Sequence, residues 1–182
     1  MKHLNLILFI VCTQLFSQTP TTKTLGGFSE LKVYDLINVE LIKASENKII
    51  ISGANSNNIN IKQKNSTLKI RMKLKYKFNG AETQVKIYYT DIDIIDANEG
   101  SFVFSKDIIK QYEIVLKAQE GSQISIKTET KRLIVKSVTG STVTTTGTSE
   151  NQDITIRTGG VYKGGNNTVE NTDLSIKAGG EA

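Results

Sequence analysis

One segment of the chain places five cations at alternate positions, separated by apolar residues. The cations are Lys69, Arg71, Lys73, Lys75 and Lys77, and the apolar set is Leu68, Ile70, Met72, Leu74, Tyr76 and Phe78. In a β-strand this alternation puts all five cations on one face, with neighbours about 7 Å apart. That spacing lets them act on one polyanion, such as an acidic polysaccharide, lipopolysaccharide phosphate or extracellular DNA. The alternative is a solvated face whose lysines protect an edge strand from aggregation.

Four carboxylates form a second group of residues that could do chemistry: Asp91, Asp93, Asp96 and Glu99. In a strand Asp91 and Asp93 share a face, whereas the other two depend on the geometry of a turn. Oxygen ligands of this kind suit Ca²⁺, and glycosidases use paired carboxylates without any histidine. No specific motif accompanies either use, so we predict no metal ion, no cofactor and no catalytic residue.

Residues 1–18 have the pattern of a secretory signal peptide. Lys2 provides a basic start, and an apolar stretch follows from Leu4 to Phe16. That stretch is too short for a permanent membrane-spanning helix. We therefore expect an exported protein, located in the periplasm, on the outer surface or outside the cell, with no transmembrane segment in its mature chain.

The same segment carries most of the residue types that enzymes depend on. His3 and Cys12 are the chain's one histidine and one cysteine. Without them there is no imidazole base, no thiolate nucleophile and no nitrogen or sulfur ligand for zinc. Loss of Lys2 also lowers the net charge from +5 to +4, which is less than a dedicated nucleic-acid binder carries. We predict a protein that is not an enzyme and has no specific nucleic-acid binding.

The elements that would position these residues are indicated by a repeat in the second half of the chain. Five glycines recur 21, 19, 20 and 20 residues apart: Gly100, Gly121, Gly140, Gly160 and Gly180. Alternating apolar pairs precede the last four glycines: Ile114 and Leu116, Leu133 and Val135, Ile154 and Ile156, Leu174 and Ile176. This period predicts a β-solenoid of about 20 residues per coil. Glycine suits its corners because a tight corner needs a positive φ.

The repeat also predicts columns of side chains along the solenoid axis. Four cations occupy equivalent places before the glycines: Lys117, Lys136, Arg157 and Lys177. We expect them to stack about one coil spacing apart. Three acids four residues earlier, Glu113, Asp153 and Asp173, would offset their repulsion, with Arg132 interrupting the acidic column. The column is therefore interpreted as a balanced, solvated surface.

No helical period appears, so we predict an all-β protein with a single domain over residues 28–182. Residues 19–27 are polar and rich in threonine, and we expect a tether there. Residues 28–84 are expected to form a small antiparallel β-sheet region that caps the first coil, with a hairpin turn at Asn79-Gly80. Residues 85–182 would form the coils.

Several stretches resemble a family of exported bacterial proteins, the putative auto-transporter adhesin, head GIN domain family, whose function is not established. The matching stretches are Phe28–Val33, Ile37–Leu41 and Asn65–Ile70, followed by the Gly-Ser pairs at Gly100, Gly121 and Gly140. The resemblance runs from Phe28 to the C-terminus. It implies a short β-sheet region followed by a right-handed single-stranded β-helix, with export in a Bacteroidota-like bacterium. In the last two repeats the pair has become Gly159-Gly160 and Gly179-Gly180.

Together these observations predict an exported, non-catalytic adhesion or binding module for polysaccharide or another surface polymer. One alternative is a scaffold that self-associates end to end. The sequence stops at Ala182, directly after a corner, and an uncapped apolar end there, natural or truncated, is expected either to pair with another chain or to leave the last coil frayed. The other alternative is a carbohydrate-active enzyme that uses carboxylates.

Overall fold

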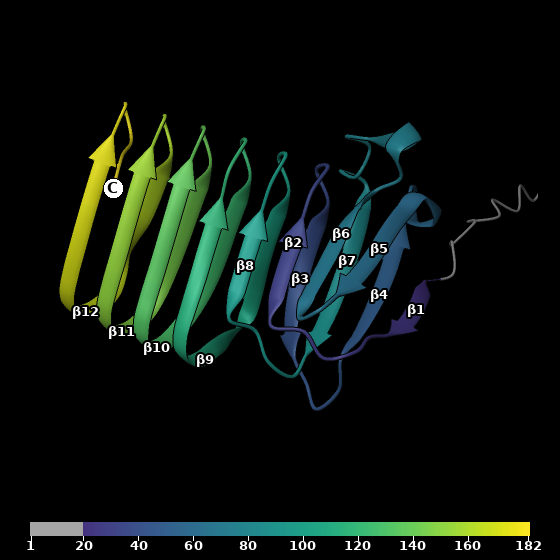
Figure 1. Cartoon of the computed structure of the whole chain (residues 1–182), viewed down its shortest axis with the longest axis horizontal. Coiled ribbons are helices and arrows are strands. Elements are labelled where there is room, and N and C mark those ends of the chain that lie inside the picture. The colour runs from purple at the N-terminus through teal and green to yellow at the C-terminus, as the bar shows by residue number, and fades with distance from the viewer. Residues whose placement is uncertain (1–19) are drawn as a thin grey trace, which may run out of the picture.

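The computed structural model describes residues 20–182, and the predicted signal peptide lies outside the described residues. The all-β fold is confirmed: the chain forms one 12-stranded sheet that winds around a common core (Figure 1). Two 3₁₀ turns, η1 (Ser56–Asn58) and η2 (Leu74–Tyr76), interrupt it. The strands are β1 (Thr21–Thr24), β2 (Glu30–Val33), β3 (Asn38–Lys43), β4 (Lys48–Gly53), β5 (Ile59–Lys64), β6 (Thr67–Met72), β7 (Thr83–Tyr89), β8 (Ile94–Ala97), β9 (Phe102–Ala118), β10 (Gln123–Val138), β11 (Thr142–Arg157) and β12 (Val161–Lys177).

The predicted β-solenoid is confirmed in β9 to β12. Each of these strands has 16 or 17 residues and forms a whole coil, and consecutive coils pair in parallel. Every coil bends midway and returns, so the solenoid has two faces (Figure 1). The two faces are distinguished at β9, whose first residues pair with β3 and whose last residues pair with β8.

The core lies between the two faces and follows from the alternation in the sequence. Leu116, Val135 and Ile154 occupy equivalent places in three coils and are buried in one column. Their neighbours along each strand point outward, as the two-residue period of a strand requires. Each buried aliphatic side chain of this size contributes about 1.5–3 kcal/mol of hydrophobic stabilisation relative to an exposed one. Stacking is therefore needed for stability, because one coil cannot cover its own apolar face.

Each corner consists of two consecutive residues in the left-handed backbone conformation. In five corners the second residue is a glycine with φ between +69° and +74°: Gly100, Gly121, Gly140, Gly159 and Gly179. In the corner between β2 and β3 it is Leu36, with φ +64°. The N–H of this second residue donates to the corner carbonyl of the next coil, as from Gly121 to Thr139 O at 3.1 Å. The predicted corner glycines Gly160 and Gly180 are therefore wrong by one residue, because the corner uses the first glycine of each pair.

The second glycine of each pair replaces a serine. In the preceding coil Ser141 Oγ donates to Ala118 O at 2.7 Å and ties neighbouring coils together. Two strands further on, the register puts the larger Ile156 in the place of Ala118. A Cβ at Gly180 would lie 2.5 Å from Ile156 Cγ2, and one at Gly160 would lie 2.2 Å from a backbone carbonyl. At Gly180, isoleucine and glycine together thus fill the room that a small residue and a serine share in the earlier coils.

The N-terminal region differs from the small antiparallel sheet that we expected, because its pairing is mixed. β2 lies between β6 and β8, and β3 lies between β7 and β9. All four of these pairs are parallel and continue the coils. The antiparallel strands β4 and β5 cover the outer edges of β7 and β6. The expected tether is also corrected, since β1 pairs with β4 and Leu25 is buried.

The strand expected over Leu68–Phe78 ends at Met72. Residues 73–82 then connect β6 to β7, which belong to opposite faces and do not pair with each other. Asn79-Gly80 is therefore not a hairpin turn. Glycine is required at position 80 for another reason: a Cβ there would lie 2.3 Å from the backbone oxygen of Asp35.

Candidate functional site

A row of lysines crosses the outer face of the sheet along the solenoid axis. Strand register pairs Lys62 with Lys69, Lys69 with Lys32, and Lys117 with Lys136. Asp96 of β8 stands between Lys32 and Lys117 in the same row. The row, here called the lysine ladder, consists of Lys62, Lys69, Lys32, Lys117 and Lys136.

The ladder exists because each lysine lies next to residues that point into the core. Leu31 and Val33 flank Lys32 and are fully buried, which turns the lysine outward. The same pattern holds for Lys117 between Leu116 and Ala118. Neighbouring strands are about 4.8 Å apart, so the ladder presents cations at that interval except where Asp96 intervenes.

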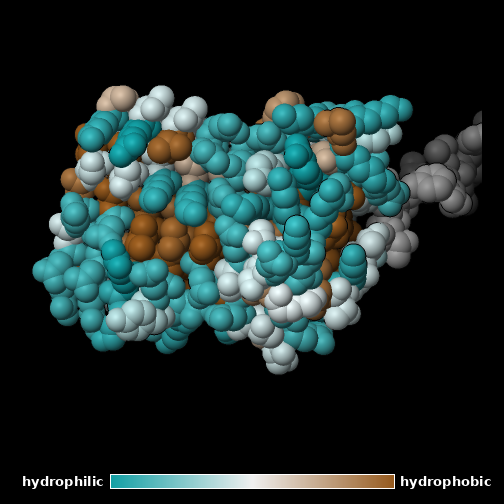
Figure 2. Space-filling view, viewed as in Figure 1, coloured by the Kyte–Doolittle hydropathy of each residue, from teal (hydrophilic) through white to brown (hydrophobic). Residues whose placement is uncertain are grey.

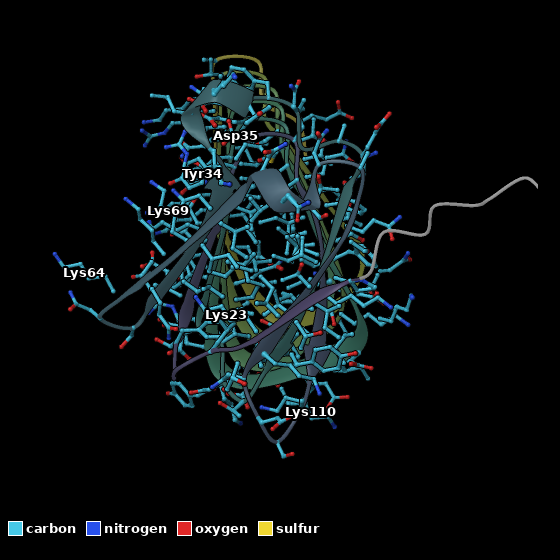
Figure 3. The ribbon with its side chains drawn as sticks, turned by 90° about the vertical axis from the view of Figure 1, so that its right-hand side faces the viewer. Lys23, Tyr34, Asp35, Lys64, Lys69 and Lys110 are labelled. Carbon is cyan, nitrogen blue, oxygen red and sulfur yellow. The ribbon has the colours of Figure 1, made fainter. Side chains whose placement is uncertain are left out.

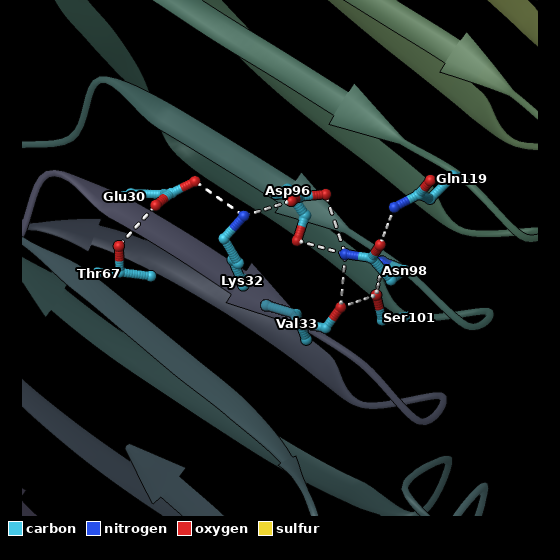
Figure 4. A network of polar contacts seen from close by, with 8 residues as sticks. All are labelled: Glu30, Lys32, Val33, Thr67, Asp96, Asn98, Ser101 and Gln119. Atoms are coloured by element: carbon cyan, nitrogen blue, oxygen red, sulfur yellow. Dashed lines mark hydrogen bonds and ion pairs between the residues drawn. The ribbon is translucent and has the colours of Figure 1, made fainter. Parts of the chain in front are cut away.

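Asp96 fixes the middle of the ladder through a network of polar contacts (Figure 4). Lys32 Nζ lies 3.0 Å from both Asp96 Oδ2 and Glu30 Oε1. Thr67 donates to the other oxygen of Glu30 at 2.6 Å, and Asn98 Nδ2 donates to Asp96 Oδ1 at 2.9 Å. These contacts join β6, β2 and β8 and hold Lys32 in place.

The network also shifts the protonation of its members. Burial raises the pKa of the Glu30 carboxyl, but hydrogen bonds from Thr67 and Lys32 outweigh this effect and bring that pKa below its ordinary value. Burial lowers the pKa of Lys32, and its hydrogen bonds to Glu30 and Asp96 more than reverse that, so the pKa of this amine lies above its ordinary value. Both groups are therefore charged at neutral pH, and their charges offset each other.

The other cations of the ladder are available to a ligand. Across residues 20–182, no carboxylate lies within 4.0 Å of the amines of Lys62, Lys117 or Lys136. Lys62 and Lys136 are exposed and Lys117 is half-buried. The cations of this face that form no ion pair are thus spread along the solenoid axis rather than gathered at one point.

An apolar row runs beside the ladder. Ile94, Val115 and Ile134 pair in register two residues before Asp96, Lys117 and Lys136, and all three are half-buried. Residues two apart on one strand are about 7 Å apart. Figure 2 shows an apolar patch on this face of the coils, bordered by hydrophilic side chains. A ligand lying here would meet apolar surface and cations together.

The predicted cation row is divided by the end of β6. Lys69 and Arg71 do share one strand face, and their cationic groups lie 4.5 and 5.5 Å from the centre of the Tyr34 ring. Figure 3 shows Lys69 and Tyr34 on the same side of the molecule. Lys73, Lys75 and Lys77 instead lie in the connection from β6 to β7. Only Lys69 of the predicted row belongs to the lysine ladder.

The predicted column of four cations splits into two pairs. Lys117 stacks on Lys136, but Arg157 stacks between Val138 and Lys177. The register between β10 and β11 puts Thr155 in the place of the lysines.

The predicted interruption by Arg132 is also corrected. This guanidinium joins the acids of two other coils, with Nη1 3.5 Å from Glu113 Oε2 and Nη2 2.5 Å from Asp153 Oδ2. Asp173, the third acid of the predicted column, pairs with Asp153 in register on β12. Arg132 was expected to interrupt the acidic column, but it instead bridges Glu113 and Asp153 and offsets their negative charge.

The four predicted carboxylates have separate surroundings. Asp96 belongs to the ladder network, and Glu99 forms an ion pair with Lys77 at 3.2 Å. Asp91 accepts a hydrogen bond from Gln111, and Asp93 is exposed. In the described part of the chain, no three histidine, cysteine or acidic side chains gather in a way that could hold a metal ion.

Sequence reasoning missed two members of the ladder, Lys32 and Lys62. The signal for Lys32 was present, because Leu31-Lys32-Val33 has the same order as Leu68-Lys69-Ile70 and Leu116-Lys117-Ala118. What the pattern did not contain was the order of the strands in space. β2 lies between β6 and β8, far from its place in the sequence.

Comparison with solved structures shows the same fold at low sequence identity. A putative adhesin from Bacteroides fragilis matches with a TM-score of 0.64 and 14% identity, over 91% of this chain and 96% of that one. A putative adhesin from Parabacteroides distasonis matches with a TM-score of 0.58 and 13% identity, over 90% and 96%. A putative lipid binding protein, also from Parabacteroides distasonis, matches with a TM-score of 0.58 and 10% identity, over 87% and 79%.

Sequence comparison identifies the family. No curated protein matches the chain. Within residues 20–182 there is no helix with the length and apolar character needed to cross a membrane. The family described as "Putative auto-transporter adhesin, head GIN domain" matches residues 27–182. Since this match covers nearly all of the described residues, the chain belongs to the head GIN domain family of putative auto-transporter adhesins.

Proposed function

We propose that this protein is a non-catalytic binding module that holds an acidic polysaccharide, or a similar acidic surface polymer, along the lysine ladder. The observation that carries the proposal is the register of Lys69, Lys32, Lys117 and Lys136 across the coils. Membership of a family named for adhesins fits a surface or exported protein that is not an enzyme.

A linear polymer fits the ladder better than a small ligand does. The cations lie in a row rather than around a cavity, and the row follows the solenoid axis. Single exposed ion pairs contribute only about 0–1 kcal/mol each. A polymer that carries one carboxylate per sugar can form several such pairs at once, and the local concentration of its remaining groups rises after the first contact.

The apolar row favours an acidic polysaccharide over polyanions that contain no sugar. Val115 and Ile134 lie beside Lys117 and Lys136 on the same face. A pyranose ring has a nonpolar face that can cover such side chains while its carboxylate reaches a lysine. A polyphosphate chain has charge alone and gains nothing from Val115 or Ile134.

The proposal is tested by retention on an immobilised acidic polysaccharide. We expect Lys117→Gln/Lys136→Gln to elute at lower salt than the unmodified protein, with about fivefold weaker binding. The matched control is Lys110→Gln/Lys131→Gln, which removes the same charge from the middle of β9 and β10, where both lysines are paired with glutamates. Equal elution of the two double variants would contradict the proposal, because only net charge would then matter.

A further inference from the structure

The connection between β6 and β7 exposes two large apolar side chains. Leu74 is 86% exposed and Phe78 is 51% exposed. They alternate with the exposed lysines Lys73, Lys75 and Lys77. This segment, residues 73–78, is here called the basic tip, and it projects beyond the end of β6 (Figure 1).

The basic tip is held in place by a buried carboxylate. Asp35 is fully buried, and its two oxygens accept the N–H groups of Met72 at 3.0 Å and Phe78 at 3.3 Å, at the two ends of the tip. Arg71 Nε lies 3.5 Å from the same carboxylate. The exposure of Leu74 therefore does not result from a frayed loop, because the backbone on both sides of it is fixed.

Further contacts tie the tip to the turn before β5. The N–H of Lys73 donates to Asn58 O at 2.7 Å, and Lys73 Nζ donates to Asn57 O at 2.8 Å. Asn55 Nδ2 donates to Asn79 O at 2.9 Å, just beyond the tip. With both ends and one side anchored, the tip presents its side chains on a preformed backbone.

The backbone at Phe78 is in an unusual conformation. Its φ is +63°, in the left-handed region that residues with bulky side chains rarely adopt. Such strain persists where surrounding contacts fix it, and it gathers at functional positions. Here the hydrogen bond from Phe78 N to Asp35 maintains it, with half of the aromatic ring left in solvent.

The charge around the tip is mainly positive. Lys77 Nζ lies over the Phe78 ring at 4.6 Å and pairs with Glu99 at 3.2 Å. Lys75 Nζ lies over the ring of Tyr76 at 5.8 Å. Two acids line the same surface hollow as Phe78: Glu99, which is paired with Lys77, and Glu120. The amines of Lys75 and Lys77 therefore lie beside aromatic rings on the surface of the tip.

From this arrangement we infer that the basic tip docks on an anionic lipid bilayer. Leu74 and Phe78 would enter the boundary between headgroups and acyl chains, and Lys73 and Lys75 would meet the lipid phosphates. Cations beside inserted apolar side chains are the usual arrangement for interfacial binding. This contact goes beyond the proposed function, since it positions the protein rather than holding its polymer.

Two other occupants fit the tip less well. A folded protein partner normally buries about 800 Å² on each side, far more than two exposed apolar side chains provide. An acidic polysaccharide binds best along an extended row such as the lysine ladder, and it would contact few groups on a projecting segment of six residues. A bilayer is the partner that offers both an apolar layer and a layer of negative charge at the depth of one side chain.

The test uses the exported chain and vesicles of phosphatidylcholine, with or without phosphatidylglycerol, in a co-sedimentation assay. We expect binding only to vesicles with phosphatidylglycerol, and a loss of at least tenfold in Leu74→Ser/Phe78→Ser. The matched control is Tyr112→Ser, which removes another strongly exposed ring (77% exposed) on β9 and should leave binding unchanged. We expect Glu120→Gln to strengthen binding, because it removes a negative charge beside the tip.

A fluorescence experiment reports the contact directly. The chain contains no tryptophan, so Leu74→Trp introduces a single reporter whose emission should shift to shorter wavelength with phosphatidylglycerol vesicles. Tyr112→Trp should show no shift. Equal binding to neutral vesicles, unchanged binding of the Leu74→Ser/Phe78→Ser variant, or sedimentation without vesicles would each overturn the inference.

The same variants separate this inference from the proposed function. Lys117→Gln/Lys136→Gln should keep its vesicle binding, and Leu74→Ser/Phe78→Ser should keep its retention on the acidic polysaccharide. A failure in one assay with success in the other then identifies which of the two proposals is wrong.

Discussion

Lys32 Nζ and Asp96 Oδ2 lie 3.0 Å apart across β2 and β8, although 64 residues separate them in the sequence. This ion pair is the one place where the lysine ladder contains an acid. It holds Lys32 in position, and it also reduces the positive charge that a polymer would meet. The two effects can be separated by substitution.

Asp96→Asn should weaken folding and strengthen polymer binding. The side chain of Asp96 is buried, so loss of its charge leaves Lys32 and Asn98 with poorer partners, at a cost of about 1–2 kcal/mol. The ladder also gains one net positive charge, and retention on the acidic polysaccharide should rise. Urea unfolding and salt elution measure the two effects. A variant that is less stable and is retained more weakly would contradict the role given to Asp96.

Acid should destabilise the protein through Glu30 and Glu40. Hydrogen bonds from Thr67 and Lys32 bring the pKa of Glu30 below 4.5, and a hydrogen bond from Lys106 does the same for the pKa of Glu40. The folded state therefore binds fewer protons than the unfolded state below about pH 4.5. The stabilisation is complete above that pH and is lost as the pH falls through the lowered values.

Urea midpoints measured from neutral pH to about pH 3 check this expectation. Glu30→Gln should flatten the acid side of the profile, whereas Glu46→Gln, which changes an exposed side chain, should leave the profile unchanged. If Glu30→Gln has the same acid dependence as the unmodified protein, Glu30 does not contribute in this way.

Tyr89→Phe should leave stability unchanged or raise it by about 1 kcal/mol at neutral pH. The Tyr89 hydroxyl is buried and has no hydrogen-bond partner among the described residues, so its removal costs no contact. Burial, followed by the charge of Asp107, raises the pKa of Tyr89 to about 12. Because the unfolded state loses the phenol proton above about pH 10 while the folded state retains it, the free energy of unfolding should fall as the pH rises from 10 towards 12.

Thermal unfolding across this alkaline range gives the measurement. Tyr89→Phe should lose less stability between pH 10 and 12 than the unmodified protein does. The control is Tyr88→Phe, which removes the hydroxyl of the neighbouring half-buried tyrosine. A marked loss of stability in Tyr89→Phe at neutral pH would mean that the hydroxyl has a partner after all.

Two glycines should differ strongly in their tolerance of alanine. The Cβ added by Gly140→Ala would have no atom within 4 Å. Only the φ of +69° disfavours alanine there, and this should lower the free energy of unfolding by about 1–2 kcal/mol. Gly147→Ala would place its Cβ 2.1 Å from Thr128 O and should cost considerably more. Thermal unfolding compares the two. Equal losses would show that the backbone of β11 moves freely at Gly147.

The periodic parts of the structure could be predicted from the sequence. Alternation in Leu133 and Val135 and the recurrence of Gly100, Gly121 and Gly140 gave the solenoid and its corners. The corners at Gly159 and Gly179 were misplaced because two adjacent glycines fit the period equally well. The second glycine of each pair avoids a close contact with the preceding coil, Gly160 with the backbone oxygen of Ser137 and Gly180 with Ile156, and these contacts are visible only once the coils are stacked.

The basic tip could not be predicted, because its alternation continues that of β6 without a break. Asp35, which is distant in sequence, accepts the N–H of Met72 and ends the strand there. The lysine ladder was found only in part for a similar reason. Lys32 joins it through the position of β2 between β6 and β8, which no local pattern specifies.

The most direct test of the lysine ladder is the salt dependence of binding to a soluble acidic polysaccharide. The unmodified protein and Lys117→Gln/Lys136→Gln are titrated over a range of salt concentrations, and log Kd is plotted against log salt. If both lysines contact the polymer, the slope for the variant should be smaller by about 1–2 units. Parallel lines for the two proteins would contradict the account, since they would show that neither Lys117 nor Lys136 displaces counterions from the polymer.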